Sequence, residues 1–352
     1  MSVAFQPYGV WTALVTPFKE DGQIDLDAFK RTVDFQIAEG ITGIVPAGTT
    51  GESPSLRWSE HNLVIEEGVA FADGRVGVLA GTGSNSTEEA IEATRHAQQA
   101  GASAALVVDC YYNAPSSLEL RTEYYECIAD NAPGIPIVPY IIPGRCGTEM
   151  SAADLAILHN DPTRFPAVKQ ATGNIDRMRL DREYCGTELA IMSGDDDMTL
   201  TMMKDEQIRA SGVISVMSNI APGALSRMVK AMRASDRTTA DKIAAQLAPL
   251  FKLVGCKILS TRRLKDGRSV QVEDRFRNPV PVKTMMAGLG MGVGACRRPL
   301  GMMTPAGVEA CRAALRSIHD ATPEILSPIE AAFGVKIAER LGNDDVWAAL
   351  AR

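Results

Sequence analysis

One pattern repeats along residues 9–216: a short apolar run, followed by a longer segment whose apolar residues recur at helical spacing. The first run spans Gly9 to Val15, and apolar residues then recur between Asp25 and Gly40. This predicts a strand followed by a helix. Seven more predicted strands cover residues 43–47, 76–80, 104–108, 135–140, 165–170, 189–193 and 212–216.

Most of these strands are apolar throughout, which is typical of a parallel sheet covered by helices on both faces. Eight such strands are the number that closes into a barrel. A doubly wound open sheet is the alternative, but no G-x-G-x-x-G opens an early helix. We therefore expect an α/β fold, a catalytic (β/α)8 TIM barrel over residues 1–235, followed by a C-terminal helical domain over residues 236–352.

The second domain contains a charged insert near residues 256–277, where seven Lys/Arg stand against three Asp/Glu. We expect a solvated surface excursion and assign it no function.

The whole chain carries a net charge of −7, which argues against a nucleic-acid partner. Its seven scattered cysteines predict reduced thiols, with no disulfide or metal site. Without a signal-like N-terminus or a long apolar span, we expect no membrane association and a cytoplasmic location.

Lys169 stands at the end of the sixth predicted strand, after the apolar residues Phe165 to Val168. In a (β/α)8 barrel the chemistry lies at this end of the strands. If apolar walls surround the ammonium, its pKa falls and the free amine can form a Schiff base with a ketone. The alternative is a lysine whose stem lies along the strand while its charge reaches solvent.

The ends of the other predicted strands carry groups that suit the same chemistry. Residues 48–53 (GTTGES) offer hydroxyls and backbone N–H groups that could hold an anion. A tyrosine can shuttle protons, and an arginine can fork onto a carboxylate. The candidates at these strand ends are Thr49, Thr50, Tyr111, Tyr112, Tyr140, Arg145 and Gly194.

Two other groups of polar residues are given structural interpretations. The carboxylates at residues 195–197 cannot all face one metal ion, and we expect them to cap the helix that contains Leu200 and Met203. We expect most histidines to face solvent or to be structural, and no Ser/His/Asp arrangement competes with Lys169. The histidines are His61, His96, His159 and His319.

Several motifs resemble the dihydrodipicolinate synthase and N-acetylneuraminate lyase family of pyruvate-dependent class I aldolases. They are GTTGES at 48–53, YYN at 111–113, PGR at 143–145, VKQATGN at 168–174 and GVISVMSN at 212–219. The resemblance runs from Val10 to Pro222 and resumes weakly at 278–283 (NPVPVK) and 297–300 (RRPL). The motifs are most similar to the synthase branch, because the lyases usually lack an arginine placed like Arg145.

The resemblance implies roles for these residues. Lys169 would form the imine with pyruvate without any other cofactor, and Tyr140 would pass protons. Thr50 and Tyr112 would complete the proton relay, with Tyr112 reaching into a neighbouring subunit's site. The pyruvate would be surrounded by Thr49, Thr50, Gly194 and Ile214. Arg145 would hold the carboxylate of the second substrate.

The implied activity is condensation of pyruvate with L-aspartate 4-semialdehyde to 4-hydroxy-tetrahydrodipicolinate, in lysine and diaminopimelate biosynthesis, by a homotetramer built as a dimer of dimers. One alternative is a related lyase or hydratase acting on a 2-keto-3-deoxy sugar acid. Another is a barrel that binds a keto acid without catalysis. Ile141 and Cys110 stand where the family usually has asparagine and proline, and both change the pocket wall rather than its chemical groups.

The resemblance also implies that L-lysine inhibits the enzyme at a tight-dimer interface. Glu89 would pair with the α-amino group of the ligand, and Tyr111 would meet its carboxylate. Trp58 would cover its methylene stem. Hydrogen bonds would come from Ser53, His61 and Asn85. In the alternative interpretation Glu89 only occupies the first turn of a helix, where a carboxylate is favoured in any case.

Overall fold

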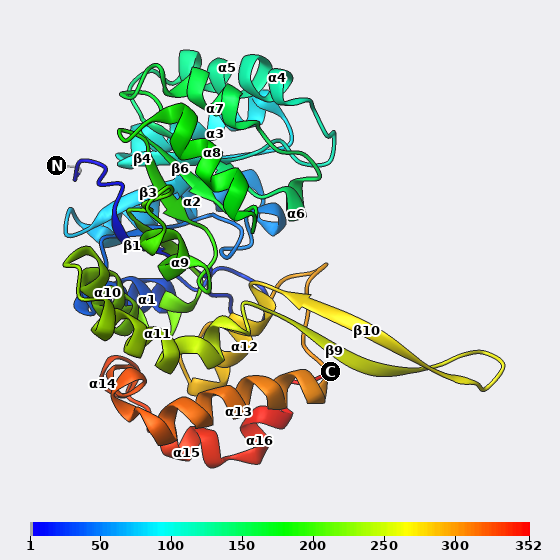
Figure 1. Cartoon of the computed structure of the whole chain (residues 1–352). Coiled ribbons are helices and arrows are strands. Elements are labelled where there is room, and N and C mark those ends of the chain that lie inside the picture. Colours follow the sequence, from blue (N-terminus) through cyan, green and yellow to red (C-terminus); the bar gives the residue numbers. More distant parts are fainter. Residues whose placement is uncertain (1–2) are drawn as a thin grey trace.

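A computed structural model of the chain describes residues 3–352. Eight parallel strands close into a barrel in sequence order, and β1 completes the ring by pairing with β8 (Figure 1). The expected (β/α)8 fold is confirmed, and each strand boundary lies within two residues of its prediction. The strands are β1 (Gly9–Ala13), β2 (Gly43–Val45), β3 (Gly77–Gly81), β4 (Ala104–Val108), β5 (Ile137–Ile141), β6 (Ala167–Gln170), β7 (Ala190–Ser193) and β8 (Gly212–Ser215).

Helices follow the strands and cover the outside of the barrel. The first begins after Asp25, whose carboxylate accepts the N–H of Ala28 at 2.9 Å and so caps the helix. The helical elements of this part are α1 (Leu26–Ala38), η1 (Ser53–Ser55), α2 (Trp58–Ala72), α3 (Thr87–Ala100), α4 (Ser117–Glu119), η2 (Leu120–Tyr125), α5 (Glu126–Asn131), α6 (Pro143–Cys146), α7 (Ala152–His159), α8 (Ile175–Cys185), α9 (Thr199–Lys204), η3 (Met217–Asn219) and α10 (Pro222–Arg233).

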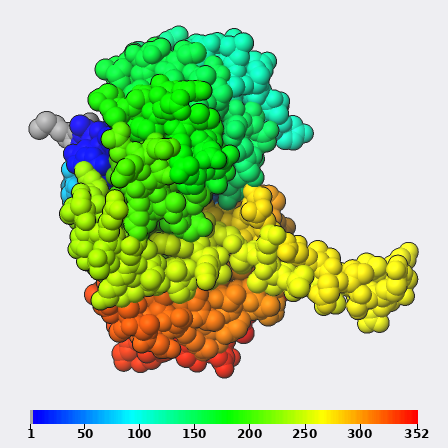
Figure 2. All heavy atoms as spheres, viewed as in Figure 1, coloured from blue at the N-terminus to red at the C-terminus, as the bar shows by residue number. Residues whose placement is uncertain are grey.

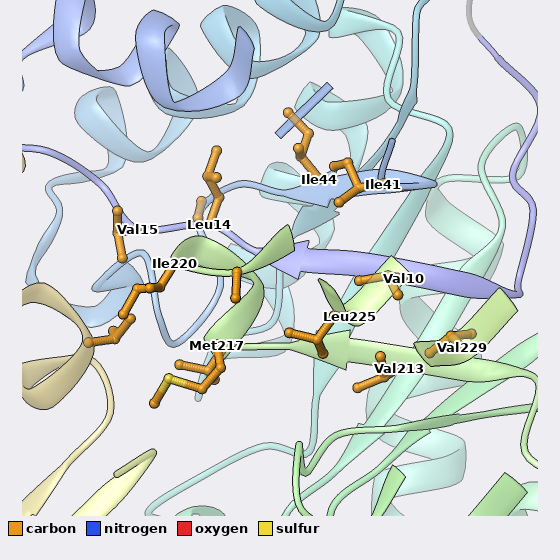
Figure 3. Packing of buried hydrophobic residues seen from close by; sticks show 14 of the residues in the cluster. Val10, Leu14, Val15, Ile41, Ile44, Val213, Met217, Ile220, Leu225 and Val229 are labelled. Carbon is orange, nitrogen blue, oxygen red and sulfur yellow. The ribbon is translucent and has the colours of Figure 1, made fainter. Parts of the chain in front are cut away.

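Alternate strand residues divide the core into two layers, as the period of two in a strand requires. Val10, Ile44 and Val213 face outward and pack with Leu225 of α10 between the barrel and its helices (Figure 3). Residues one position along each strand fill the inside of the barrel, among them Trp11 of β1. This alternation decides which side chains can reach the open end of the barrel from within.

The C-terminal part packs below the barrel in Figure 1. The predicted boundary at residue 235 falls in the turn between α10 and the next helix. Trp347 lies so close to Gly288 that a Cβ there would be 2.2 Å from its ring. The elements are α11 (Arg237–Phe251), β9 (Gly255–Arg263), β10 (Ser269–Arg277), α12 (Val280–Leu289), α13 (Pro305–Ala321), η4 (Pro323–Ile325), α14 (Ser327–Phe333), α15 (Ile337–Gly342) and α16 (Asp344–Ala348).

The charged insert is not helical but forms an antiparallel β-hairpin of β9 and β10 that projects from the body of the protein (Figures 1 and 2). Its tip turns at Gly267, whose φ of +85° favours glycine. Leu259 is 69% exposed, so the outer part is a surface excursion as expected. The hairpin root, by contrast, reaches the open end of the barrel. None of the described helices is both long enough and apolar enough to span a bilayer.

Candidate active site

Lys169 of β6 points into the barrel beside Tyr140 of β5, with which it is in register. Its Nζ lies 4.0 Å from the centre of the Tyr140 ring, and the residue is only 5% exposed. Burial lowers the pKa of Lys169 to about 8, although the carboxylates of Asp195 and Asp196 oppose the shift. The interpretation of a lysine that extends to solvent is therefore wrong. The amine has the environment that a Schiff-base nucleophile requires.

Lys169 and Tyr140 lie on the wall of a cavity of about 500 Å³ at the C-terminal end of the strands. The structure brings most of the predicted site residues to this cavity. Those that line it are Thr49, Thr50, Ser53, Tyr111, Tyr140, Arg145, Lys169 and Gly194. Ile214 instead belongs to the packed interior of the barrel, where it is 1% exposed. It is not among the residues that line the cavity.

Burial raises the pKa of the Tyr140 phenol, and the nearby Arg145 guanidinium opposes this shift. The phenol is therefore protonated at neutral pH and can donate a proton or hydrogen bond to a bound substrate. The nearby Thr49 side chain favours the ionised form of the phenol and so opposes the rise in its pKa. This pair connects the loop after β2 to the phenol that faces Lys169.

The loop that carries Thr49 and Thr50 is fixed from several directions. The hydroxyl of Thr16 donates to the carbonyl oxygen of Gly51 at 2.7 Å. The amide of Asn278 donates to the Thr50 hydroxyl oxygen at 2.9 Å. Glu52, next in the loop, is buried against Lys283 of α12. The C-terminal part therefore helps to hold the threonines at the cavity.

The carboxylates at residues 195–197 do not cap the next helix, so this prediction is wrong. Helix α9 has Met198 at its N-cap and no side-chain cap. Buried Asp196 instead accepts the Ser215 hydroxyl and the N–H groups of Val216 and Met217, at 3.0 and 3.2 Å from the two nitrogens. It thereby fixes the turn after β8. Asp195 lines the cavity, and burial raises its pKa to about 6.

Two of the histidines are buried rather than solvent-facing, as the structural interpretation allows. His61 is 2% exposed, and burial lowers its pKa to about 4, so its ring is neutral at physiological pH. His159 is also buried, and its Nδ1 lies 2.9 Å from the carbonyl oxygen of Phe165. Among residues 3–352, no group of three His, Cys, Asp or Glu side chains has a geometry that could hold a metal ion.

The residues predicted to bind lysine fall into two groups. Glu89 accepts the Ser84 hydroxyl at 2.5 Å, and its charge helps raise the pKa of Tyr111, although burial is the larger cause. Trp58 packs edge-on against His61 with ring centroids 5.0 Å apart. Asn85 is exposed, and Tyr112 is 88% exposed with a φ of 77°.

Several lining residues come from a segment to which the sequence assigned no role. Val254, Gly255, Arg275, Arg277 and Asn278, at the hairpin root, all line the cavity. Only the weak motif at 278–283, directly after the insert, indicated that the chain returns to the site here.

Comparisons with known proteins identify the family and related structures. The model of the dihydrodipicolinate synthetase family matches residues 6–318. The chain is 39% identical over 318 residues to 4-hydroxy-tetrahydrodipicolinate synthase of Methanothrix thermoacetophila, covering 90% of this chain and 99% of that protein. A solved dihydrodipicolinate synthase from Cyanidioschyzon merolae with lysine bound has a TM-score of 0.79, with 32% identity and coverage of 89% and 99%. Another, from Acinetobacter baumannii and complexed with pyruvate, has a TM-score of 0.77 with the same identity and coverage.

Proposed function

The chain belongs to the dihydrodipicolinate synthetase family, and from this premise we propose that it condenses pyruvate with L-aspartate 4-semialdehyde to 4-hydroxy-tetrahydrodipicolinate in lysine biosynthesis. The observation that carries the chemical mechanism is the buried amine of Lys169, with its lowered pKa, against the Tyr140 phenol in one cavity. Pyruvate binding by the A. baumannii relative supports the first substrate.

The free amine of Lys169 adds to the keto carbon of pyruvate, and loss of water gives the imine. Loss of a methyl proton then gives an enamine, whose carbon forms the new bond to the aldehyde carbon of the second substrate. The aldehyde oxygen gains a proton, and attack of the substrate's own amino group at the imine carbon closes the ring and releases Lys169. The lysine supplies the covalent chemistry itself, so no other cofactor takes part.

The proton transfers fall to Tyr140, because its phenol is buried next to the amine that changes protonation state. Thr49 and Thr50 hold pyruvate together with Gly194, all of which line the cavity. Thr50 passes protons onward to Tyr112. Arg145, which lines the same cavity, binds the carboxylate of the second substrate. Ile214 contributes as packing behind the cavity wall.

Reductive trapping tests the covalent step. Incubation with pyruvate and borohydride should add one reduced pyruvate to each chain, and peptide mass mapping should place it on Lys169. The Lys169→Arg variant should add none. Trapping at another lysine, or none in the wild type under conditions that trap a known aldolase, would contradict the mechanism.

The second substrate is tested separately, because a lyase or hydratase for a 2-keto-3-deoxy sugar acid would form the same imine. Turnover of aspartate semialdehyde should exceed turnover of such sugar acids. A higher rate with the sugar acids would support the alternative. A barrel that only binds a keto acid could still trap pyruvate, but it would turn over neither aspartate semialdehyde nor the sugar acids.

The family relationship also supports two further parts of the proposal, a homotetrameric assembly and inhibition by L-lysine. The exposure of Tyr112 fits a residue that enters the site of a second subunit in a homotetramer. The C. merolae relative binds lysine, which supports L-lysine as an inhibitor here. We place the barrel over residues 1–235 and the C-terminal domain over residues 236–352, in a cytoplasmic protein.

A further inference from the structure

The root of the β9–β10 hairpin is built into the mouth of the cavity, whereas its outer part projects away from the body of the protein (Figures 1 and 2). Arg275 and Arg277 stand two residues apart on β10, so both side chains leave the same face of the hairpin. Both line the cavity together with Gly255 of the facing strand.

Reciprocal hydrogen bonds hold this root against the loop after β5. Arg145 donates from Nη2 to the carbonyl oxygen of Asn278 at 2.8 Å. Arg277 donates in return from Nη1 to the carbonyl oxygen of Gly144, also at 2.8 Å. The amide of Asn278 then reaches the Thr50 hydroxyl. The hairpin root is therefore a fixed part of the cavity wall rather than a loop that passes over it.

The three arginines bring positive charge together without a protein counterion. Three other basic residues of the hairpin, Lys257, Arg262 and Arg268, are paired with carboxylates, for example Arg262 with Asp274 at 2.7 Å. Within residues 3–352, Arg145, Arg275 and Arg277 form no ion pair, and all three line the cavity. Burial lowers the pKa of Arg145, and the charges of the other two arginines lower it further.

The charged side chains that line the cavity are these three arginines, Lys169 and a single carboxylate, Asp195. Like charges held close together repel one another, and this repulsion falls when an anion binds among them. A guanidinium fork matches the two oxygens of a carboxylate, so a carboxylate is the fitting ligand.

We propose that Arg275 and Arg277 form, with Arg145, an anion subsite at the cavity mouth that receives the carboxylate of the second substrate while its aldehyde faces Lys169. This rests on the proposed function, because it presupposes the pyruvate imine. The ligand class is an aldehyde that bears a carboxylate, in preference to a neutral polyhydroxy aldehyde. The dicarboxylate product fits the same subsite.

The test replaces Arg275 and Arg277 by glutamine, because glutamine keeps a polar side-chain amide but carries no charge. For Arg275→Gln with Arg277→Gln, the KM for aspartate semialdehyde should rise roughly 10–100-fold, the range of one or two lost charge-assisted contacts. The KM for pyruvate and the borohydride-trapping rate should change less than about twofold. Arg263→Gln, on the exposed outer part of the same hairpin, is the matched control and should change nothing.

A second readout does not depend on turnover. Pyridine-2,6-dicarboxylate, a planar analogue of the product, should bind the wild type and Arg263→Gln equally in calorimetry, and the double variant at least tenfold more weakly. Arg277→Lys, which keeps the charge, should bind more tightly than Arg277→Gln. Equal binding by all variants, or a parallel rise in the KM for pyruvate, would overturn the subsite. Failure of the wild type to trap pyruvate, with the binding difference intact, would instead count against the proposed function alone.

Discussion

The Nζ of Lys283 lies 2.7 Å from Oε1 of Glu52, and both side chains are buried, with 1% and 0% of their surface exposed. Lys283 also donates to the carbonyl oxygens of Thr16 and Ala295, each at 3.1 Å. The second oxygen of Glu52 accepts the N–H of Arg297 at 2.8 Å. Because Glu52 follows the two site threonines, this pair fastens the C-terminal part to the loop that carries them.

Removing one partner of this pair should destabilise the protein strongly. Lys283→Met leaves the Glu52 carboxylate buried without a counterion, which typically costs ~3–5 kcal/mol. Urea unfolding should show this loss in the free energy of unfolding. The control is Lys336→Met, which breaks the exposed pair with Glu339 and should leave the free energy of unfolding nearly unchanged. Similar losses in both variants would contradict a structural role for the buried pair.

The sequence predicted what depends on local periodicity and missed what depends on distant contacts. The strand containing Lys169 followed from the apolar run that precedes it, and the closed barrel followed from the number of such runs. Glu52 and Lys283, however, are 231 residues apart, and no local pattern relates them. Asp196 was misread for the same reason, because its partners belong to the turn after β8.

The sequence of the hairpin contains a strand pattern, but its high content of charged residues drew the interpretation away from a strand. Val270 and Val272 alternate with polar residues, which is typical of a strand with one covered face. The abundance of lysine and arginine indicated only a solvated surface excursion. That Arg275 and Arg277 reach the cavity follows from pairing register and from the anchoring of the root, which only the three-dimensional structure supplies.

The pH dependence of imine formation should report the lowered pKa of Lys169. Only the neutral amine attacks the ketone, so the rate of imine formation should rise with pH and level off above a midpoint near the pKa of about 8. At pH 7 about a tenth of the amines would be neutral, against fewer than about one in a thousand for an unshifted lysine. Single-turnover trapping from pH 6 to 10 measures this midpoint.

A charge change beside Lys169 should move that midpoint in a known direction. The Asp195 carboxylate favours the ammonium form and raises the pKa of Lys169. Asp195→Asn should therefore shift the midpoint to lower pH, by roughly half to one unit. Asp197→Asn is the control, because Asp197 is exposed and should move the midpoint much less. A shift to higher pH in Asp195→Asn would refute this assignment.

Tyr140→Phe removes the proton donor but keeps the ring against which Lys169 packs. Turnover should fall ~10²–10⁴-fold, the usual contribution of a positioned acid–base group. Tyr184→Phe, at a half-exposed site on α8, should retain wild-type turnover. Circular dichroism and urea unfolding establish that the Tyr140 variant is folded. Turnover within a few-fold of the wild type would assign the proton transfers to another group.

Mixing two inactive variants tests whether Tyr112 acts across subunits. If Tyr112 completes the partner's site, a hybrid dimer of Tyr112→Phe and Lys169→Ala has one intact site and one site with both defects. Activity should then return on mixing, after dissociation and reassociation of the chains. If Tyr112 serves its own chain, each site of the hybrid carries one defect. Verified hybrids that remain as inactive as the parent variants would show that arrangement.

L-Lysine should inhibit turnover, and the loss should not be relieved by excess pyruvate, because the ligand would bind away from Lys169 and favour a less active state of the dimer. The contacts that motivate this are the proximity of Glu89 to Tyr111 and the packing of Trp58 on His61. A carboxylate pairs well with the α-amino group of lysine. Steady-state rates over a range of lysine concentrations measure the inhibition.

A comparison of Glu88 with Glu89 distinguishes a role of Glu89 in binding lysine from a role only in stabilising the helix N-terminus. Glu88 and Glu89 both lie in the first turn of α3, so either carboxylate interacts favourably with the helix N-terminus. Glu88 is exposed, whereas Glu89 is half-buried, accepts the Ser84 hydroxyl and lies near Tyr111. Both alanine variants should lose a similar few tenths of a kcal/mol of stability from the helix terminus. Only Glu89→Ala should lose inhibition by lysine. If both variants are inhibited equally by lysine, Glu89 contributes only to the stability of the helix.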